Sequence, residues 1–231
     1  CRDYDLSRFS AAAVPITSGL GIIGGFAKSV DAILDRLGMR SRVTSSTDVT
    51  GFREAVESGA DIVMMSDDPT FVAYNTRENK FTDNSWGTAM GYAVCLKNAA
   101  NGVEGKGVLV VGAGRVGAWA AEILAGWGAE VKVTDIVFEK AEALASVGAT
   151  PLKNVEKAIS ENTLVINAAP YIIPGEIIAP GSIISSPGVP HYYDLEGRTR
   201  CKAIIHDPLE IGTAVMAVNS AAYTIKKEEQ A

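Results

Sequence analysis

The chain has 231 residues, enough for two small domains or one large one, and its hydrophobic and charged content is ordinary for a globular protein. A net charge of −6 and a sequence pI near 5.0 argue against nucleic acid as a partner, because no cluster of Lys or Arg offers a track for phosphates. No apolar run approaches the roughly 20 residues of a membrane helix, and no signal segment is evident. We expect a cytoplasmic protein with no membrane partner.

The cysteines indicate neither a disulfide framework nor a metal site. Cys1, Cys95 and Cys201 are few, odd in number and without the spacing of zinc ligands. Their pattern is typical of reduced thiols in a cytoplasmic protein. We therefore expect no bound metal.

The first part of the chain alternates apolar strands with helices. Residues 1–13 carry no clear pattern. After them, residues 14–19 are interpreted as a short strand that runs into a loop with glycine and hydroxyl residues. Hydrophobic spacing then predicts a helix over 23–37, a strand near 41–45, a helix over 50–58 and a strand at 61–65. This βαβαβ order predicts a sheet of parallel strands with right-handed crossovers.

Two loops of this part contain candidate substrate contacts. Thr17 and Ser18 lie in a glycine-containing loop between a strand and a helix, where free N–H groups often meet ligands. Helix capping is the alternative role for their hydroxyls. Asp67 follows the strand at 61–65, at the edge of the sheet where α/β active sites collect. A solvated turn is the commoner role of its Asp-Asp-Pro sequence, so both roles stay open.

The domain boundary is predicted from turn residues. Residues 71–84 are polar and are interpreted as an excursion that precedes a helix over 85–99. The pair Asn101-Gly102 and the glycines that follow it form a strong turn signal. We therefore predict an N-terminal α/β domain at 1–100 and a second domain at 101–209, with a terminal helix over 210–225 that can return to the first.

The strongest motif spans residues 108–117, Val-Leu-Val-Val-Gly-Ala-Gly-Arg-Val-Gly. An apolar strand runs into Gly112, Gly114 and Gly117, and a helix is predicted over 118–127, which is the context of a Rossmann G-x-G-x-x-G. The first glycine permits a tight turn, the second lets a pyrophosphate approach, and the third lets the helix pack on the strand. The motif predicts a dinucleotide site, the alternative being a structural turn in a Rossmann-like domain without a ligand.

Asp135 predicts which cofactor binds. It ends a strand over 130–134, near the roughly 20-residue spacing at which an acid in this fold accepts the ribose 2′-hydroxyl. Its charge repels a 2′-phosphate, so NAD is favoured over NADP. Arg115 and Val116 lie in the same loop and are expected at the cofactor, although Arg115 at a helix start is equally suited to solvent.

The α/β pattern continues to the end of the second domain, with a helix over 139–147 and strands at 164–167, 181–185 and 202–205. Small residues after two of these strands suit a loop beside the nicotinamide half of the cofactor, namely Asn167, Ala168 and Pro170, then Pro187 and Gly188. A close-packed structural turn is the alternative. His191 and His206 are interpreted as surface or packing residues, because neither lies in a triad or a metal pattern.

Taken together, these motifs resemble the dehydrogenases that complete pyrrolysine biosynthesis from 3-methylornithyl-N6-lysine. The resemblance spans residues 14–216. It is carried by Val14-Pro15-Ile16-Thr17-Ser18-Gly19 with residues 21–24, Asp67-Asp68-Pro69-Thr70-Phe71, residues 108–117, Ser186-Pro187-Gly188-Val189-Pro190, and Pro208 with Ile211-Gly212-Thr213-Ala214.

The resemblance implies oxidation of a primary amine by NAD, loss of ammonia and closure of a pyrroline ring. It implies catalytic roles for Asp67 and Asn84, and substrate contacts from Thr17, Ser18, Ile23 and Asp207. Asp207 stands where similar proteins have a glutamate, whose side chain is longer by one methylene group.

The residues themselves fit an amine substrate. Hydride transfer beside nitrogen needs a neutral amine, so carboxylates such as Asp67 and Asp207 are expected to bind the cation and to pass on its proton. We expect a homodimer whose active sites lie between the two domains. The alternatives are a dehydrogenase of another small amino or hydroxy acid, and an NAD-binding protein without chemistry.

Overall fold

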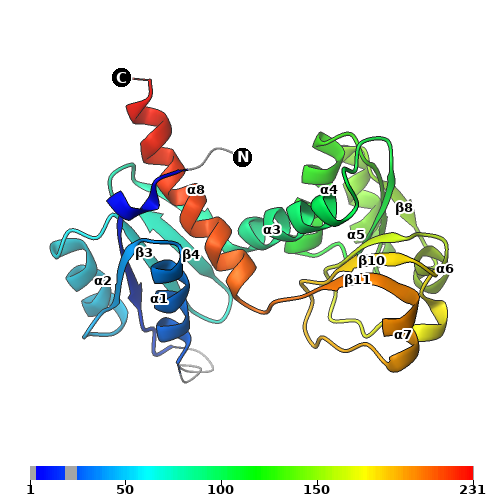
Figure 1. Ribbon diagram of the computed structural model, residues 1–231, viewed down its shortest axis with the longest axis horizontal. Helices are drawn as coiled ribbons and strands as arrows, with labels where there is room; N and C mark the ends of the chain where they lie inside the picture. Colours follow the sequence, from blue (N-terminus) through cyan, green and yellow to red (C-terminus); the bar gives the residue numbers. More distant parts are fainter. Residues whose placement is uncertain (1–3, 19–24, 231) are drawn as a thin grey trace. The chain divides into compact units, whose positions relative to one another are not determined.

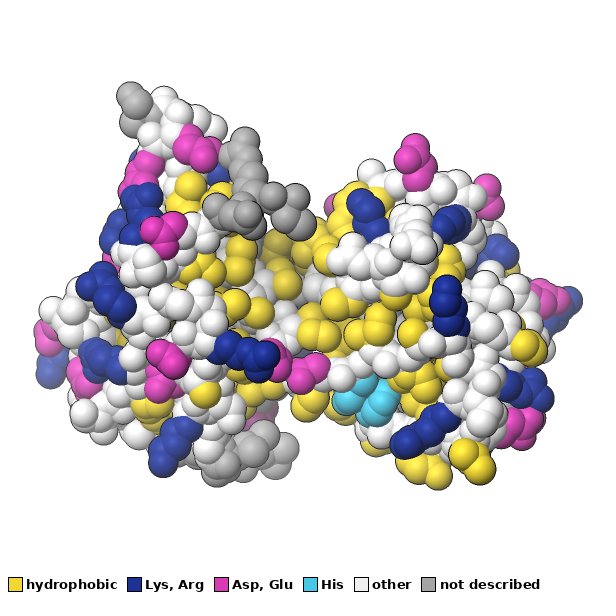
Figure 2. Space-filling view, viewed as in Figure 1, with side chains coloured by type: hydrophobic (Ala, Val, Ile, Leu, Met, Phe, Trp, Pro, Cys, Tyr) yellow, Lys and Arg dark blue, Asp and Glu magenta, His cyan; other side chains and the backbone are white. Residues whose placement is uncertain are grey.

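The computed structural model describes residues 4–18 and 25–230. The chain forms two compact units, the first from Cys1–Gly87 and Leu209–Ala231, the second from Thr88–Pro208 (Figure 1). Along the chain, the division therefore falls inside helix α3 (Asn84–Ala99). On the face drawn in Figure 2, basic and acidic side chains are interspersed over each unit, and the described basic residues form no continuous track there.

A five-stranded sheet, in the order β2-β1-β3-β4-β5, forms the centre of the first unit. Its strands are β1 (Ser10–Val14), β2 (Arg40–Val43), β3 (Ile62–Ser66), β4 (Phe71–Asn75) and β5 (Lys80–Asp83). β1 pairs in parallel with both β2 and β3, which confirms the predicted βαβαβ order. The predicted first strand was placed too late, because β1 ends where that segment was expected to begin.

The interpretation of residues 71–84 as a polar excursion is wrong, because they contain the antiparallel strands β4 and β5. Alternate residues of β4 are buried, and Asn75 is among them. Its Nδ2 donates to the carbonyl of Ser220 (2.7 Å) and to Oγ1 of Thr224 (2.9 Å). A buried strand can contain a polar side chain when that side chain is hydrogen-bonded, as Asn75 is. The expected parallel arrangement therefore holds for β1, β2 and β3 only.

Helices cover both faces of this sheet (Figure 1). α1 (Phe26–Arg36) and α8 (Glu210–Glu228) share one apolar core with alternate residues of β1 and β3. α2 (Asp48–Glu57) packs on the opposite face, where the intervening residues of β1 and β3 meet it. The period of two along a strand explains this division, since successive side chains point to opposite faces.

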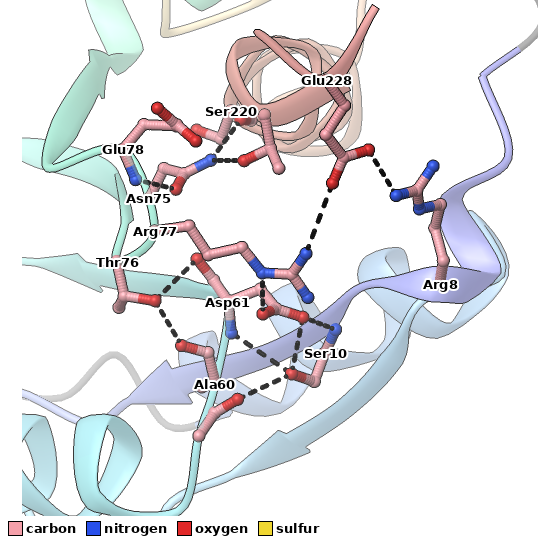
Figure 3. A network of polar contacts seen from close by, with 12 residues as sticks. Arg8, Ser10, Ala60, Asp61, Asn75, Thr76, Arg77, Glu78, Ser220 and Glu228 are labelled. Carbon is pink, nitrogen blue, oxygen red and sulfur yellow. Dashed lines mark hydrogen bonds and ion pairs between the residues drawn. The ribbon is translucent and has the colours of Figure 1, made fainter. Parts of the chain in front are cut away.

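A polar network ties the N-terminal segment, the sheet and the end of α8 together (Figure 3). Asp61 accepts hydrogen bonds from the Ser10 N–H (2.7 Å) and from Nε of Arg77 (2.6 Å). Burial raises the pKa of Asp61, but these hydrogen bonds outweigh it and hold that pKa below its ordinary value. Arg77 and Arg8 both pair with Glu228 of α8. The network is structural, and it fixes the C-terminal helix to the first unit.

The second unit contains a six-stranded sheet, in the order β11-β10-β9-β6-β7-β8, with every neighbouring pair parallel. Its strands are β6 (Gly107–Val111), β7 (Glu130–Thr134), β8 (Thr150–Leu152), β9 (Leu164–Asn167), β10 (Ser182–Ser185) and β11 (Cys201–Ile205). Two three-stranded halves begin side by side, at β6 and β9, and together form the strand order of a Rossmann domain. The first half is βαβαβ, whereas a 3₁₀ turn (Gly175–Ile177) stands between β9 and β10 in the second. The predicted Rossmann fold is thus confirmed.

Helices flank this second sheet as well. α3 and α4 (Arg115–Gly126) pack with one face of β6, β7 and β9, and α6 (Val155–Ser160) packs on the other. The predicted helix over 139–147 is α5 (Phe138–Ala143) followed by a short 3₁₀ turn. The sequence reading missed β8, α6 and α7 (Leu195–Arg200), which are too short for a periodic pattern. None of the described helices is long and apolar enough to cross a bilayer.

Candidate active site

The glycine loop after β6 uses its three glycines for different purposes. Gly112 has a φ of +94°, and a Cβ there would lie 2.9 Å from the Ala169 nitrogen. A Cβ on Gly117 would lie far under 3.0 Å from the Gly112 carbonyl oxygen. Around Gly114, by contrast, a Cβ would meet nothing within 4 Å. Packing therefore requires the first and third glycines, whereas the second leaves room for a ligand to approach the backbone.

A cavity of about 320 Å³ opens beside this loop. Five of the predicted cofactor residues line it, namely Gly112, Gly114, Asp135, Ala168 and Pro170. The N-cap of α4 is Gly114, which provides no side-chain cap, so the first N–H groups of the helix remain available to an anion. A concave, partly apolar site with free N–H groups fits a dinucleotide.

Asp135 joins the loop to the turn after β7. Its Oδ2 accepts from the Ala113 N–H (2.7 Å) and its Oδ1 from the Val137 N–H (2.8 Å). Each carboxylate oxygen can accept a second hydrogen bond, so the contacts leave capacity for ribose hydroxyls. Ile136 and Lys140 also line the cavity and were not predicted. In the sequence, the only indication for Ile136 is that it is a large apolar residue directly after Asp135. In the structure its side chain is 92% exposed.

The remaining predicted cofactor residues do not line this cavity. Asn167 donates from Nδ2 to the Tyr171 carbonyl (2.9 Å), and its own carbonyl accepts from the Gly188 N–H (3.0 Å). A Cβ on Gly188 would overlap the Ala169 carbonyl. The loops after β9 and β10 are thus closely packed on each other, as the structural-turn alternative describes. Cofactor contacts from Asn167, Pro187 and Gly188 stay predictions.

The start of α4 contains the other residues of the motif. Arg115 is exposed as the first residue of the helix. Val116 is half-buried and packs on the core shared with α3. Gly117 is buried and acts through packing. Contacts of Arg115 and Val116 with a cofactor also stay predictions.

In the first unit, Thr17 is bound to a residue that the sequence did not indicate. The Thr17 N–H and Oγ1 donate to the two carboxylate oxygens of Asp48, at 2.7 and 2.6 Å. Asp48 has a φ of +53°, an uncommon conformation for a residue with a side chain. Hydrogen bonds from Thr17, then Thr47, lower the pKa of Asp48. Thr17 therefore helps to hold the first residue of α2. This role is similar to the helix capping given above as the alternative to a substrate contact.

Ser18 lines a second cavity, of about 470 Å³, in the first unit. Its walls are mostly apolar and come from the segment after β1, from α2, from β3 and from the β4–β5 pair, with Asp48 as the charged member. A cavity of this composition suits a methylene chain. Ile23, the other predicted residue of this loop, lies outside the described residues.

Asp67 lies in an exposed turn after β3. Its Oδ1 accepts from the Thr70 N–H (2.9 Å), and its own N–H donates to the Thr70 carbonyl (2.9 Å). The segment thus forms a solvated turn, with the Asp67 carboxylate at the carboxyl end of a parallel strand. Asn84 is the half-buried first residue of α3, beside Asp83, whose Oδ1 accepts from the Ser85 N–H. Chemical roles for Asp67 and Asn84 stay predictions.

Asp207 follows β11, and a buried tyrosine fixes its main chain. The hydroxyl of Tyr92 accepts from the Asp207 N–H (2.8 Å) and donates to the Asp207 carbonyl. Tyr92 is only 1% exposed, and burial raises its pKa. Oγ of Ser185 in turn donates to the Tyr92 carbonyl (2.9 Å). Sequence reasoning missed this link, since Tyr92 is one aromatic residue in an otherwise apolar helix.

Replacing Tyr92 with Phe is expected to destabilise the second unit by about 1–3 kcal/mol, because two main-chain groups of Asp207 lose their partner. Denaturant unfolding followed by circular dichroism measures the change. Tyr192→Phe is the control, since that ring is 57% exposed. Equal stability of the two variants would show that the Tyr92 hydroxyl contributes nothing.

These features define a protein with the fold of the dinucleotide-binding dehydrogenases. Two solved structures share it. Quinate dehydrogenase from Corynebacterium glutamicum, in complex with NAD, has a TM-score of 0.58 and 17% identity over 92% of each chain. Shikimate 5-dehydrogenase from Thermus thermophilus, in complex with NADP(H) and shikimate, has a TM-score of 0.62 and 15% identity, covering 93% of this chain and 92% of the other. At such identities the likeness concerns the fold.

The sequence relatives are more specific. Residues 2–82 match the family described as "Pyrrolysine biosynthesis protein PylD, N-terminal domain", and residues 84–184 match "Alanine dehydrogenase/PNT, C-terminal domain". Pyrrolysine synthase from Methanosarcina barkeri is 36% identical over 88% of this chain and 78% of its own length. The protein of that name from Methanosarcina acetivorans is 36% identical over 88% and 79%. The chain belongs to the PylD family of pyrrolysine biosynthesis, and with this fold it is an oxidoreductase.

Proposed function

We propose that the protein oxidises the primary amine of 3-methylornithyl-N6-lysine with NAD, releases ammonia and closes the pyrroline ring of L-pyrrolysine. The observation that carries the proposal is the 36% identity to pyrrolysine synthase over 88% of the chain. The cavity beside Gly114 and Asp135 supports it, because a dehydrogenase of this kind needs a dinucleotide. When bound, NAD supplies the hydride acceptor.

The substrate side of the proposal assigns roles to residues of both units. Asp67 holds the reacting ammonium, and Asn84 is the second catalytic residue. Thr17, Ser18 and Ile23 contact the substrate. Support comes from the apolar cavity that Ser18 lines, since the lysine part of the substrate is a methylene chain.

Asp207 has a distinct place in the proposal, as a second carboxylate for the cationic substrate. Its main chain is fixed by the Tyr92 hydroxyl, so the position from which its side chain extends is well defined.

The test of the function is mass spectrometry of the products after incubation with NAD and 3-methylornithyl-N6-lysine. We expect pyrrolysine, ammonia and NADH in equal amounts. NADH without ring closure, or activity only with another small amino or hydroxy acid, would favour a dehydrogenase of a different substrate. Tight NAD binding with no NADH from any amine would favour a binding protein without chemistry.

Cofactor choice is tested by Asp135→Asn, which removes the charge but keeps an oxygen for the Ala113 N–H. We expect the preference for NAD over NADP to fall by about tenfold to a hundredfold, the worth of one charged hydrogen bond and the relieved repulsion. Affinities for both cofactors, measured by calorimetry, give the ratio.

Lys140→Gln is the matched control, because Lys140 lines the same cavity with the opposite charge. Removal of the positive charge of Lys140 should keep the preference for NAD unchanged or increase it, because a cation attracts the 2′-phosphate of NADP. Equal affinity of the wild type for NAD and NADP would contradict the assignment to Asp135.

We also propose that the protein is a cytoplasmic homodimer. Light scattering of the purified protein measures its mass in solution. A monomer that turns over normally would remove the dimer from the proposal and leave the chemistry unchanged.

A further inference from the structure

The two histidines of the chain lie face to face in the second unit. The ring centroids of His191 and His206 are 3.6 Å apart, and the ring planes differ by 4°. Figure 2 shows them as one histidine patch at the surface. No motif pairs them in the sequence, where each is interpreted as a surface or packing residue. A stacked pair of titratable rings calls for a different interpretation.

The pair lies at the edge of the sheet that binds the cofactor. His206 follows β11 directly, and His191 lies in the segment after β10. Because the strands are parallel, their carboxyl ends share one edge with the glycine loop after β6. In a sheet of this order the two halves of a dinucleotide lie over the two halves of the sheet. The glycine loop and Asp135 are predicted to bind the adenosine half, and the histidines follow strands of the other half of the sheet.

The hydrogen bonding of His206 fixes its tautomer. Its Nδ1 lies 2.7 Å from the Ser186 carbonyl oxygen. A carbonyl only accepts, so Nδ1 carries the hydrogen and Nε2 of the neutral ring has a lone pair. The main chain of the next residue, Asp207, is held by Tyr92. His206 is therefore an oriented proton acceptor.

The ring of His191, unlike that of His206, has a buried nitrogen, Nδ1, without a hydrogen bond to any of the residues described. Burial lowers the pKa of His191, and the nearby His206 and Arg198 lower it further. His191 therefore stays neutral in the range where an ordinary imidazole takes up a proton.

The surroundings of the pair contain charges of both signs. Arg198, which donates from Nε to the Tyr193 carbonyl (3.0 Å), opposes a proton on His191. The ring of Tyr193 meets His191 edge to face at 5.2 Å, and burial raises its pKa, so it stays a neutral phenol. Asp207 follows His206 in the chain and adds a negative charge. Arg198 and the neighbouring ring of His206 therefore disfavour an imidazolium at His191.

We propose that His206, stacked on His191, accepts the proton that the substrate ammonium loses before hydride transfer. The inference rests on the proposed function. The N–H bond of the ammonium breaks, its proton bonds to Nε2 of His206, and the nitrogen keeps the electron pair. The adjacent C–H bond then breaks, its hydrogen leaves with both electrons to NAD, and the nitrogen pair forms the C=N bond. The products are an iminium, NADH and one imidazolium, so atoms and charge balance.

The test uses His206→Asn in the full-length protein. The amide nitrogen of Asn can replace Nδ1 as donor to Ser186, but nothing replaces Nε2 as acceptor. We expect kcat at neutral pH to fall by roughly 10²–10⁴-fold, the contribution of a positioned base. The acid limb of the kcat/KM profile should disappear, and added imidazole should restore part of the rate. Affinity for NAD should stay unchanged.

The matched variant is His191→Asn, which removes the second ring and leaves His206 in place. It should retain most of the rate and move the acid limb of the profile without abolishing it. If His206→Asn kept both the rate and the acid limb of the wild type while making pyrrolysine, the proton role would be overturned and the proposed function would stand. If the wild type made no pyrrolysine, the proposed function itself would fail.

A second measurement needs neither cofactor nor substrate. With two histidines in the chain, their Cε1–H signals in the proton NMR spectrum can be assigned from His191→Asn and His206→Asn. As the pH is lowered, we expect the His206 signal to move first while the His191 signal keeps its neutral position. Protonation of His191 before His206, or independent titration of the two rings, would overturn the proposal.

Discussion

Asp67→Asn is expected to lower kcat/KM for the amine by roughly 10²–10⁴-fold, the range that a positioned group in proton transfer contributes. Asn has the size of Asp, and its Oδ1 can still accept from the Thr70 N–H, so the turn is retained. What disappears is the negative charge that holds the reacting ammonium and assists the loss of its proton. Initial rates of NADH formation measure the effect.

The control for this change lies in the same turn. Asp68→Asn removes an equal charge one residue further along, also at an exposed position. A general loss of negative potential would affect the two variants alike, whereas a specific contact would affect Asp67 alone. NAD affinity should be unchanged in both, since the cofactor cavity belongs to the second unit. Normal turnover of Asp67→Asn would leave this segment as a solvated turn.

The parts of the fold that could be predicted are those with local signals. The strand before Gly112 is a continuous apolar run because it is buried on both faces, and the glycines that follow it have fixed steric tasks. The strand at 164–167 was found to the residue for the same reason, and the strand at 130–134 was found to the residue from its alternation of polar and apolar residues. Asp135 was recognised from its spacing, and it does line the cavity.

The parts that could not be predicted depend on contacts between distant residues. Asn75 looks like a loop residue until its partners Ser220 and Thr224 are known, and these lie 145 and 149 residues further along the chain. Burial of an amide is affordable only with such partners, and no local pattern reveals them.

The same applies to the site. The Tyr92 hydroxyl contacts Asp207, which lies 115 residues further along the chain, and His191 stacks on the ring of His206, in the segment after β11. A motif search treats each of these residues alone. Their chemistry is a property of the pair, which only the folded chain brings together.

Gly117→Ala is expected to destabilise the second unit by about 3 kcal/mol or more, since overpacking against a rigid backbone is at the costly end of such changes. The new methyl group would overlap the Gly112 carbonyl oxygen, and neither the strand β6 nor helix α4 can move without disturbing a buried core. Thermal unfolding and amide hydrogen exchange of β6 and α4 measure the loss. Gly126→Ala, in the same helix, meets nothing within 4 Å and should be neutral or stabilising.

Gly114→Ala separates cofactor binding from folding. A Cβ there meets no protein atom within 4 Å, so stability should equal that of the wild type. The methyl group would instead occupy the space through which a pyrophosphate approaches the N-terminus of α4, and NAD affinity should fall by about tenfold or more, equivalent to roughly 1.4 kcal/mol. If Gly114→Ala bound NAD normally, the cavity beside it would not be the pyrophosphate site. A destabilised Gly117→Ala together with a stable, non-binding Gly114→Ala would show that one motif contains a glycine for the fold and a glycine for the ligand.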